Sequence, residues 1–189
     1  MVSDKSYAQV FESTIEASSR KASEQAMLAL AKSAGLSPAE REAYLRSILV
    51  DIAEAGGDVA ALTATEYVRA VAAEDPALQG LDDRPRPTDR EYLSQSVDVA
   101  LQTQTGGLHD ADRVREIRHR VALVVESHVR KAAFRHVNRL AKGLGRRSQI
   151  VAEPGACGFC LGRAKPHHRA LPPYHRRCRC SVELVSSAE

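Results

Sequence analysis

The chain has 189 residues, of which 43% are hydrophobic and 27% charged, and its formal net charge at pH 7 is +3. A chain of this length can bury one sizeable core plus a small appendage, and its composition is that of an ordinary globular protein, so we do not expect intrinsic disorder. Its apolar runs are far shorter than a membrane span, so we expect no transmembrane helix and no membrane partner.

Residues 1–75 are predicted to form an N-terminal helical region. Aromatic residues make up only 4% of the chain, so its core is expected to consist of aliphatic side chains packed between helices. Apolar residues recur at helical spacing over residues 4–34, and Gly35 supplies a C-terminal stop. Ser37 opens a capping-box pattern with Pro38 at the first helical position, which predicts the start of a second helix.

Two glycines are expected to end this second helix, because Gly56 and Gly57 follow its last apolar positions. Asp58 would then cap a third helix that ends near Pro76. Residues 76–90 contain three prolines and a glycine, which interrupt both helices and strands. This stretch is therefore predicted to be a linker or an ordered crossover.

Residues 91–150 are predicted to form a long basic helical region. It comprises a helix from about Asp89 to Gln104 and a longer one from about Ala111 to Lys142 with an apolar stripe along one side. His128 falls on this stripe, so we expect a packed histidine and not a ligand. The expected fold is mainly α, with a body of about five helices and a small C-terminal zinc knuckle with a short β element.

All four cysteines lie within residues 151–189, which are predicted to form this knuckle. A CxxC pair is followed by an HxxCxC cluster, and together they offer five candidates for the four tetrahedral positions around a structural Zn²⁺. Four sulfurs would leave the histidine as an outer-shell donor, whereas the histidine with three sulfurs would release one of the last two cysteines. An extended HxxCxC segment would place both of these thiols on one face, which favours keeping both. The candidate ligands are Cys157, Cys160, His175, Cys178 and Cys180.

Two other uses of the cysteines are less consistent with the sequence. Disulfides require an oxidising compartment, and the chain starts without the charged and apolar regions of a signal peptide. A catalytic zinc requires an open coordination position, and five candidate ligands give little reason for one. We therefore expect a structural metal and no enzymatic activity.

Charge is distributed unevenly along the chain. Residues 113–179 carry 17 Lys and Arg against 3 Asp and Glu, whereas the rest carries 10 against 21. Such a basic segment is either a solvated helix face or a surface for a phosphate backbone or an acidic protein. Few aromatic residues interleave with the cations, which favours the backbone of double-stranded DNA over a single strand. The candidate nucleic-acid-binding residues are Arg135, Arg139, Lys142, Arg146, Arg147, Arg176, Arg177 and Arg179.

The cysteine clusters carry a resemblance to a known family. The segments PGACGFC at residues 154–160 and YHRRCRCSV at residues 174–182 resemble the end of the domain of MuF-like minor capsid proteins, the phage head morphogenesis proteins of tailed bacteriophages, particularly those of actinobacteria. Residues 57–69 and 130–151 resemble a glycine-led helix and the long helix that precedes the knuckle in that family. The resemblance spans about residues 38–185.

This resemblance implies a virion protein that is present in few copies in or on the head and is assembled in the host bacterial cytoplasm. Its implied partners are the portal or major capsid protein, a scaffold protein and packaged double-stranded DNA. The loop at residues 161–174 is shorter than in many relatives, and the chain stops at Glu189, so no fused effector domain is expected.

Two further functions are consistent with the same residues. A nucleic-acid-binding regulator would use the zinc knuckle to place Arg176, Arg177 and Arg179 on phosphates. A nuclease of the HNH kind is suggested by the segment HHRALP at residues 167–172. That segment has no acidic residue beside its histidines and no asparagine after it, so the nuclease ranks last.

Overall fold

The computed structural model describes residues 4–102, 110–151, 166–167 and 181–185. The described chain is predominantly α-helical, as predicted, and none of its helices is long and apolar enough to cross a membrane. Short 3₁₀ helices follow the first and second α-helices. The elements in chain order are α1 (Asp4–Lys32), η1 (Ser33–Gly35), α2 (Pro38–Val71), η2 (Pro76–Gly80), α3 (Arg90–Leu101), α4 (Asp110–Gly143), β1 (Arg147–Val151), β2 (Pro166–His167) and β3 (Ser181–Val185).

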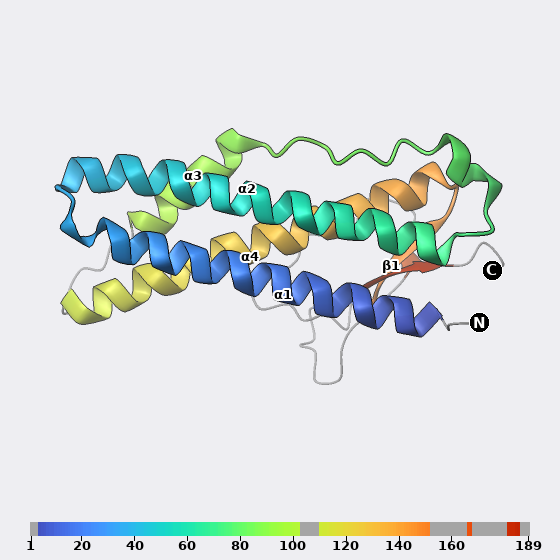
Figure 1. Cartoon of the computed structure of the whole chain (residues 1–189), viewed down its shortest axis with the longest axis horizontal. Coiled ribbons are helices and arrows are strands. Elements are labelled where there is room, and N and C mark those ends of the chain that lie inside the picture. The colour runs from blue at the N-terminus through green and yellow to red at the C-terminus, as the bar shows by residue number, and fades with distance from the viewer. Residues whose placement is uncertain (1–3, 103–109, 152–165, 168–180, 186–189) are drawn as a thin grey trace.

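The long helices α1, α2 and α4 lie side by side along the longest axis of the molecule and enclose one hydrophobic core (Figure 1). Each contributes one ring to an aromatic cluster. The ring of Phe11 stacks on that of Tyr67 with centroids 4.7 Å apart, and its centroid lies 6.5 Å from that of Phe134. Aliphatic side chains fill the rest of the core, so the two helical regions expected from the sequence share a single interior.

The turn between α1 and α2 has the capping box that the sequence predicts. The backbone N–H of Ser37 donates to the Glu40 carboxylate at 3.0 Å, and the Ser37 hydroxyl oxygen accepts from the backbone N–H of Glu40. The Arg41 guanidinium donates to the carbonyl oxygens of Ser33 and Ala34 at 3.0 and 2.7 Å. These bonds satisfy backbone groups at both helix ends and hold the turn closed.

Helix α2 continues through Gly56 and Gly57, so the predicted boundary between a second and a third helix is wrong. A Cβ at position 56 would lie 2.8 Å from Val129 Cγ2 and 3.2 Å from the Cβ of Ala22. A Cβ at position 57 would lie 3.0 Å from the Nε2 of His128. The glycines therefore serve close packing between helices, and the burial that this packing allows offsets their low helix propensity.

Helix α4 is followed by a glycine in the left-handed conformation. Gly145 has a φ of 68°, in the left-handed region that glycine adopts without strain. Its N–H donates to the carbonyl of Lys142, and the N–H of Arg146 donates to that of Ala141. This pair of bonds is a Schellman motif, which ends the helix and directs the chain into β1.

Helices α2 and α4 run in the same direction, which the colour gradient in Figure 1 makes visible. Gly57 packs against His128, and eight residues further along each helix Thr65 hydrogen-bonds to His136. Two parallel neighbours require the chain to return along the body between them. Residues 81–89, which we call the crossover, and helix α3 lie on this return path (Figure 1).

The three strands form an antiparallel sheet in the order β2-β1-β3. Val151 at the end of β1 pairs with Ser181 at the start of β3. Strand β3 is anchored to the helices, because Val182 is fully buried in the core and the Leu184 N–H donates to the Tyr67 hydroxyl at 3.3 Å. The stretch between residues 151 and 181 therefore begins and ends at one point of the helical body.

We predict that Gly56→Leu lowers the free energy of unfolding by about 3 kcal/mol, because the new side chain meets the fully buried Val129. Chemical denaturation followed by circular dichroism measures this change. The matched control is Ala55→Leu, which adds the same side chain at the adjacent exposed position and should change stability by less than about 0.5 kcal/mol. Equal effects of the two substitutions would contradict the packing role of Gly56.

Candidate functional site

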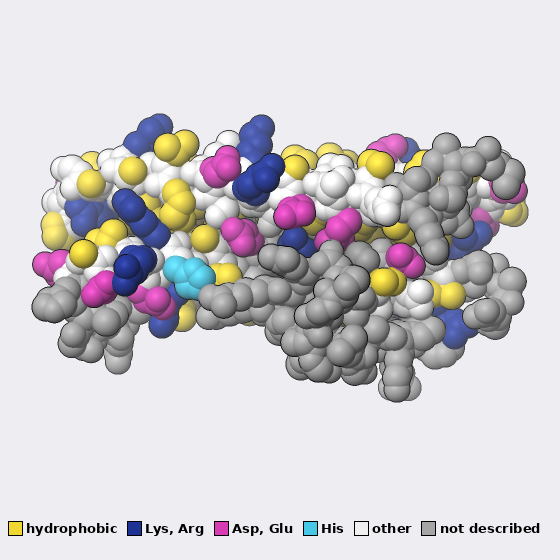
Figure 2. Space-filling model, turned by 90° about the horizontal axis from the view of Figure 1, so that it is seen from below, with side chains coloured by type: hydrophobic (Ala, Val, Ile, Leu, Met, Phe, Trp, Pro, Cys, Tyr) yellow, Lys and Arg dark blue, Asp and Glu magenta, His cyan; other side chains and the backbone are white. Residues whose placement is uncertain are grey.

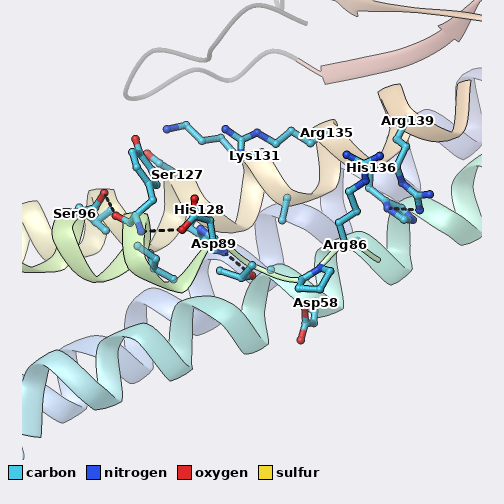
Figure 3. A pocket seen from close by; sticks show the side chains of 18 of the residues that line it. Asp58, Arg86, Asp89, Ser96, Ser127, His128, Lys131, Arg135, His136 and Arg139 are labelled. Carbon is cyan, nitrogen blue, oxygen red and sulfur yellow. Dashed lines mark hydrogen bonds between the residues drawn. The ribbon is translucent and has the colours of Figure 1, made fainter. Parts of the chain in front are cut away.

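A groove with a volume of about 780 Å³ lies between α4, α3 and the crossover (Figure 3). Its floor is formed in part by Gly57 and Ala61 of α2. The absence of a side chain at Gly57 lets α4 approach α2 there, while the crossover and α3 form the opposite wall. The groove is thus a product of the parallel arrangement of α2 and α4 with the return path beside them.

One end of the groove is basic. Lys131, Arg135, Arg139 and Lys142 line it from α4, where spacings of three and four residues place them on one face of the helix. Arg86 reaches toward α4 from the crossover (Figure 3). Five cationic side chains therefore line this end.

Two carboxylates also line the groove, but neither forms a salt bridge with these cations among the described residues. Asp89 is the N-cap of α3, and its carboxylate accepts the backbone N–H of Tyr92 at 3.0 Å. Asp58 points away from Arg86 and Lys131 (Figure 3). Partial burial, followed by the charge of Glu54, raises the pKa of Asp58. Of the five groove cations, only Arg139 forms a salt bridge with a described residue, at 3.7 Å from the Asp82 carboxylate of the crossover.

The other end of the groove combines exposed apolar side chains with the polar side chains of Gln95, Ser96 and Ser127. Tyr92 and Val99 of α3 line it, and they are 57% and 65% exposed. Leu123 and Val124 of α4 face them across the groove and are half-buried. Tyr92 and Val99 belong to a set of eight exposed large apolar side chains among the described residues, and these two lie on one wall beside a basic end.

A hydrogen-bond network, buried at Thr65 and His136, fixes the crossover against the helices. Arg139 donates to the carbonyl oxygens of Asp82 and Arg84, and its Nη2 lies 3.3 Å from His136 Nδ1. Because a guanidinium only donates, His136 Nδ1 is the acceptor in this contact. The His136 ring therefore carries its proton on Nε2, which donates a hydrogen bond to the Thr65 hydroxyl at 2.8 Å. Burial, reinforced by the Arg139 charge, lowers the pKa of His136 and keeps its ring neutral.

The sequence carries no clear signal of this network. His136 and Thr65 occupy buried positions on the apolar faces of α4 and α2, and a single polar residue on an apolar face is an ambiguous signal. Their role as a hydrogen-bonded pair is evident from the 2.8 Å distance between Thr65 Oγ1 on α2 and His136 Nε2 on α4. Only the packing of the two helices determines this distance.

The candidate nucleic-acid-binding residues fall into different surroundings. Arg139 is engaged in the network, and Arg146 forms a largely buried ion pair with Asp75 at 2.9 Å. Both cations therefore serve the fold. Arg135 and Lys142 line the groove and form no salt bridge with the described residues. The remaining candidates are Arg147, which begins β1, and Arg176, Arg177 and Arg179, which lie outside the described residues.

Acidic residues from the first half of the chain neutralise part of the basic helix. Besides the ion pair at Arg146, Arg130 contacts Glu12 of α1 at 3.3 Å, and both side chains are largely buried. On the face drawn in Figure 2, basic and acidic side chains are accordingly mixed over the described part of the molecule. Fewer cations of the second half of the chain are therefore without an acidic neighbour than the charge count of the sequence suggests.

The predicted metal ligands Cys157, Cys160, His175, Cys178 and Cys180 all lie outside the described residues. Among residues 4–102, 110–151, 166–167 and 181–185, no three His, Cys, Asp or Glu side chains are grouped in a way that could hold a metal ion.

His128 is a packed histidine at the floor of the groove, as its position on the apolar stripe predicts. Its ring contacts the backbone of Gly57, and its Nε2 lies 3.5 Å from the Thr88 hydroxyl. Burial, together with the charges of Arg135 and Lys131, lowers the pKa of His128 to about 4. The ring is therefore neutral at physiological pH.

Comparison with known proteins gives one match. The family described as VG15 protein matches residues 1–189, the whole of the chain. No curated protein and no solved structure matches it.

We predict that lowering the pH from about 6.5 to 4 reduces stability in part through His128. The unfolded state takes up a proton near pH 6.5 that the folded state accepts only near pH 4, so the free energy of unfolding falls across this window by up to roughly 3 kcal/mol from this group. Above the window both states are neutral and the contribution is constant.

Urea titrations at several pH values measure this dependence. His128→Gln should flatten it between pH 4 and 6.5, whatever the variant does to stability at pH 7. Parallel curves for His128→Gln and the wild type would show that His128 does not titrate as described.

Proposed function

The chain belongs to the VG15 protein family, a family of phage proteins, and on that premise we propose that it is a minor capsid protein for head morphogenesis in a tailed bacteriophage. The observation that carries the proposal is the match to this family over all 189 residues. The MuF-like cysteine clusters support it from the sequence. A helical body with a groove that is basic at one end is consistent with a protein that acts by binding other virion components.

The proposed contacts are of two kinds. The helical body would meet the portal, the major capsid protein or a scaffold protein. The basic cysteine stretch, with Arg176, Arg177 and Arg179, would meet the backbone of packaged double-stranded DNA. Arg139 and Arg146 are not assigned to DNA, because their guanidinium groups bind Asp82, Arg84 and Asp75 within the body. No catalytic step is assigned to any residue.

The proposal includes one structural Zn²⁺ held by four of Cys157, Cys160, His175, Cys178 and Cys180. Thiolates and imidazole are the donors that structural zinc sites use. The pairing of Val151 with Ser181 supports a single site, because it brings together the two strands between which all five candidates lie in the sequence. Zinc would hold the CxxC pair and the HxxCxC cluster together, and β1 and β3 would attach the stretch that contains them to the helices.

We predict that the purified protein contains about one zinc per chain and that Cys157→Ser loses it. The helical circular dichroism signal of the variant should remain, because the core of α1, α2 and α4 contains none of the candidate ligands. Elemental analysis and circular dichroism on one sample measure both properties. His168→Ala, a change at a histidine not assigned to the metal, serves as the control and should retain zinc. Wild-type protein without zinc would contradict the metal assignment.

We predict that the chain co-purifies with phage heads at low abundance relative to the major capsid protein. Mass spectrometry of gradient-purified particles from the encoding phage measures this ratio. A suppressible nonsense codon early in its gene should reduce the yield of complete heads, whereas a nonsense codon in a tail gene should leave heads intact. Complete, infectious particles that lack the chain would contradict the proposed role.

A further inference from the structure

We propose that the groove between α4, α3 and the crossover binds an acidic segment of a partner protein that carries apolar residues at one end. The chemistry of the groove is the basis for this assignment. That the partner is another virion protein rests on the proposed function, but the preference of the groove for such a segment does not.

The first observation is the pairing state of the cations on α4, just after its end and on the crossover. Arg120, Arg130 and Arg146 form ion pairs with Glu116, Glu12 and Asp75. The groove cations differ from these, because no salt bridge to a described residue is formed by Arg86, Lys131, Arg135 or Lys142.

These four groove cations are held on two elements that the network of Arg139 and His136 fixes against each other. Their spacing is therefore set before a ligand arrives. Preorganised cations bind carboxylates at a lower entropic cost than cations on mobile segments.

The second observation is the presence of exposed apolar side chains at the other end of the groove. Tyr92 and Val99 are more than half exposed on the wall of the groove, and Leu123 and Val124 lie opposite. A nucleic acid is anionic along its whole length, so it would place phosphates against these side chains. An acidic peptide with apolar residues at one end complements both ends of the groove. The charge and apolar pattern thus favour a protein segment over DNA.

The dimensions agree with a short linear segment. From Leu123 to Lys142 the helix rises about 28 Å, which an extended peptide of about nine residues spans. The chain's own cysteine stretch is a poor occupant on charge grounds, because residues 152–180 contain six Lys and Arg but only one Glu. An acidic segment of a different protein fits better.

The test uses the full chain and two labelled peptides of about twelve residues, with leucines at one end and glutamates at the other, in either order. Fluorescence anisotropy should show saturable binding by at least one of them. Replacing its glutamates with glutamine should weaken binding at least about tenfold, and raising the salt concentration should weaken it further.

Matched variants locate the site. Lys131→Gln/Arg135→Gln should weaken peptide binding at least about tenfold, and Tyr92→Ser/Val99→Ser should do so at the other end. Arg113→Gln/Arg118→Gln removes two exposed cations from the same helix outside the groove and should leave binding unchanged. Circular dichroism shows that each variant retains its helices.

Three results would overturn the proposal. The first is the absence of saturable binding by both peptides up to about 1 mM. The second is an equal loss of peptide binding in the Lys131→Gln/Arg135→Gln variant and in the Arg113→Gln/Arg118→Gln control. The third is binding of a short DNA duplex that depends on Lys131 and Arg135 while peptide binding does not, which would make the groove a nucleic-acid site. A chain absent from virions would defeat the proposed function but leave these measurements unaffected.

Discussion

The parallel packing of α2 on α4 is the constraint from which the rest of the structure follows. Gly56 and Gly57 let the two helices approach, and eight residues later Thr65 meets His136 in the same register. Because neighbouring helices that run in one direction cannot be joined by a short turn, the chain must return along the body. The return path lies beside α4, and the groove forms between them.

Local rules in the sequence predict the ends of most elements. The capping box at Ser37, the Asp89 N-cap and the glycine stop after α4 each depend on groups within a few residues, so they are visible without a structure. Gly56 and Gly57 were misinterpreted because the same residue type ends helices and permits close packing between them. Only the positions of Val129 and Ala22 across the interface distinguish the two roles.

The sequence indicates that the second half of the chain is basic, but it does not indicate which of its cations line the groove. A count of charges identifies the second half of the chain as basic, yet it treats Arg135 and Arg139 as equivalent. In the folded chain Arg139 binds backbone carbonyls of the crossover, whereas Arg135 faces the groove. The apolar side of the groove comes from α3, whose exposed Tyr92 and Val99 carry no sequence signal that separates them from core residues. Long-range contacts thus decide which charged residues are available to a partner.

The pairing of Val151 with Ser181 makes the packing of the helices independent of the length and sequence of the stretch between these two residues. Since the two ends of the stretch are adjacent and β2 within it also pairs with β1, longer connections between these strands leave the distances across their bases unchanged, and each doubling of a loop's length costs only about 0.6 kcal/mol. The helices can therefore stay constant while this stretch acquires insertions, substitutions or a grafted domain. Divergence among relatives should accordingly be greatest there, with little demand for compensating changes elsewhere.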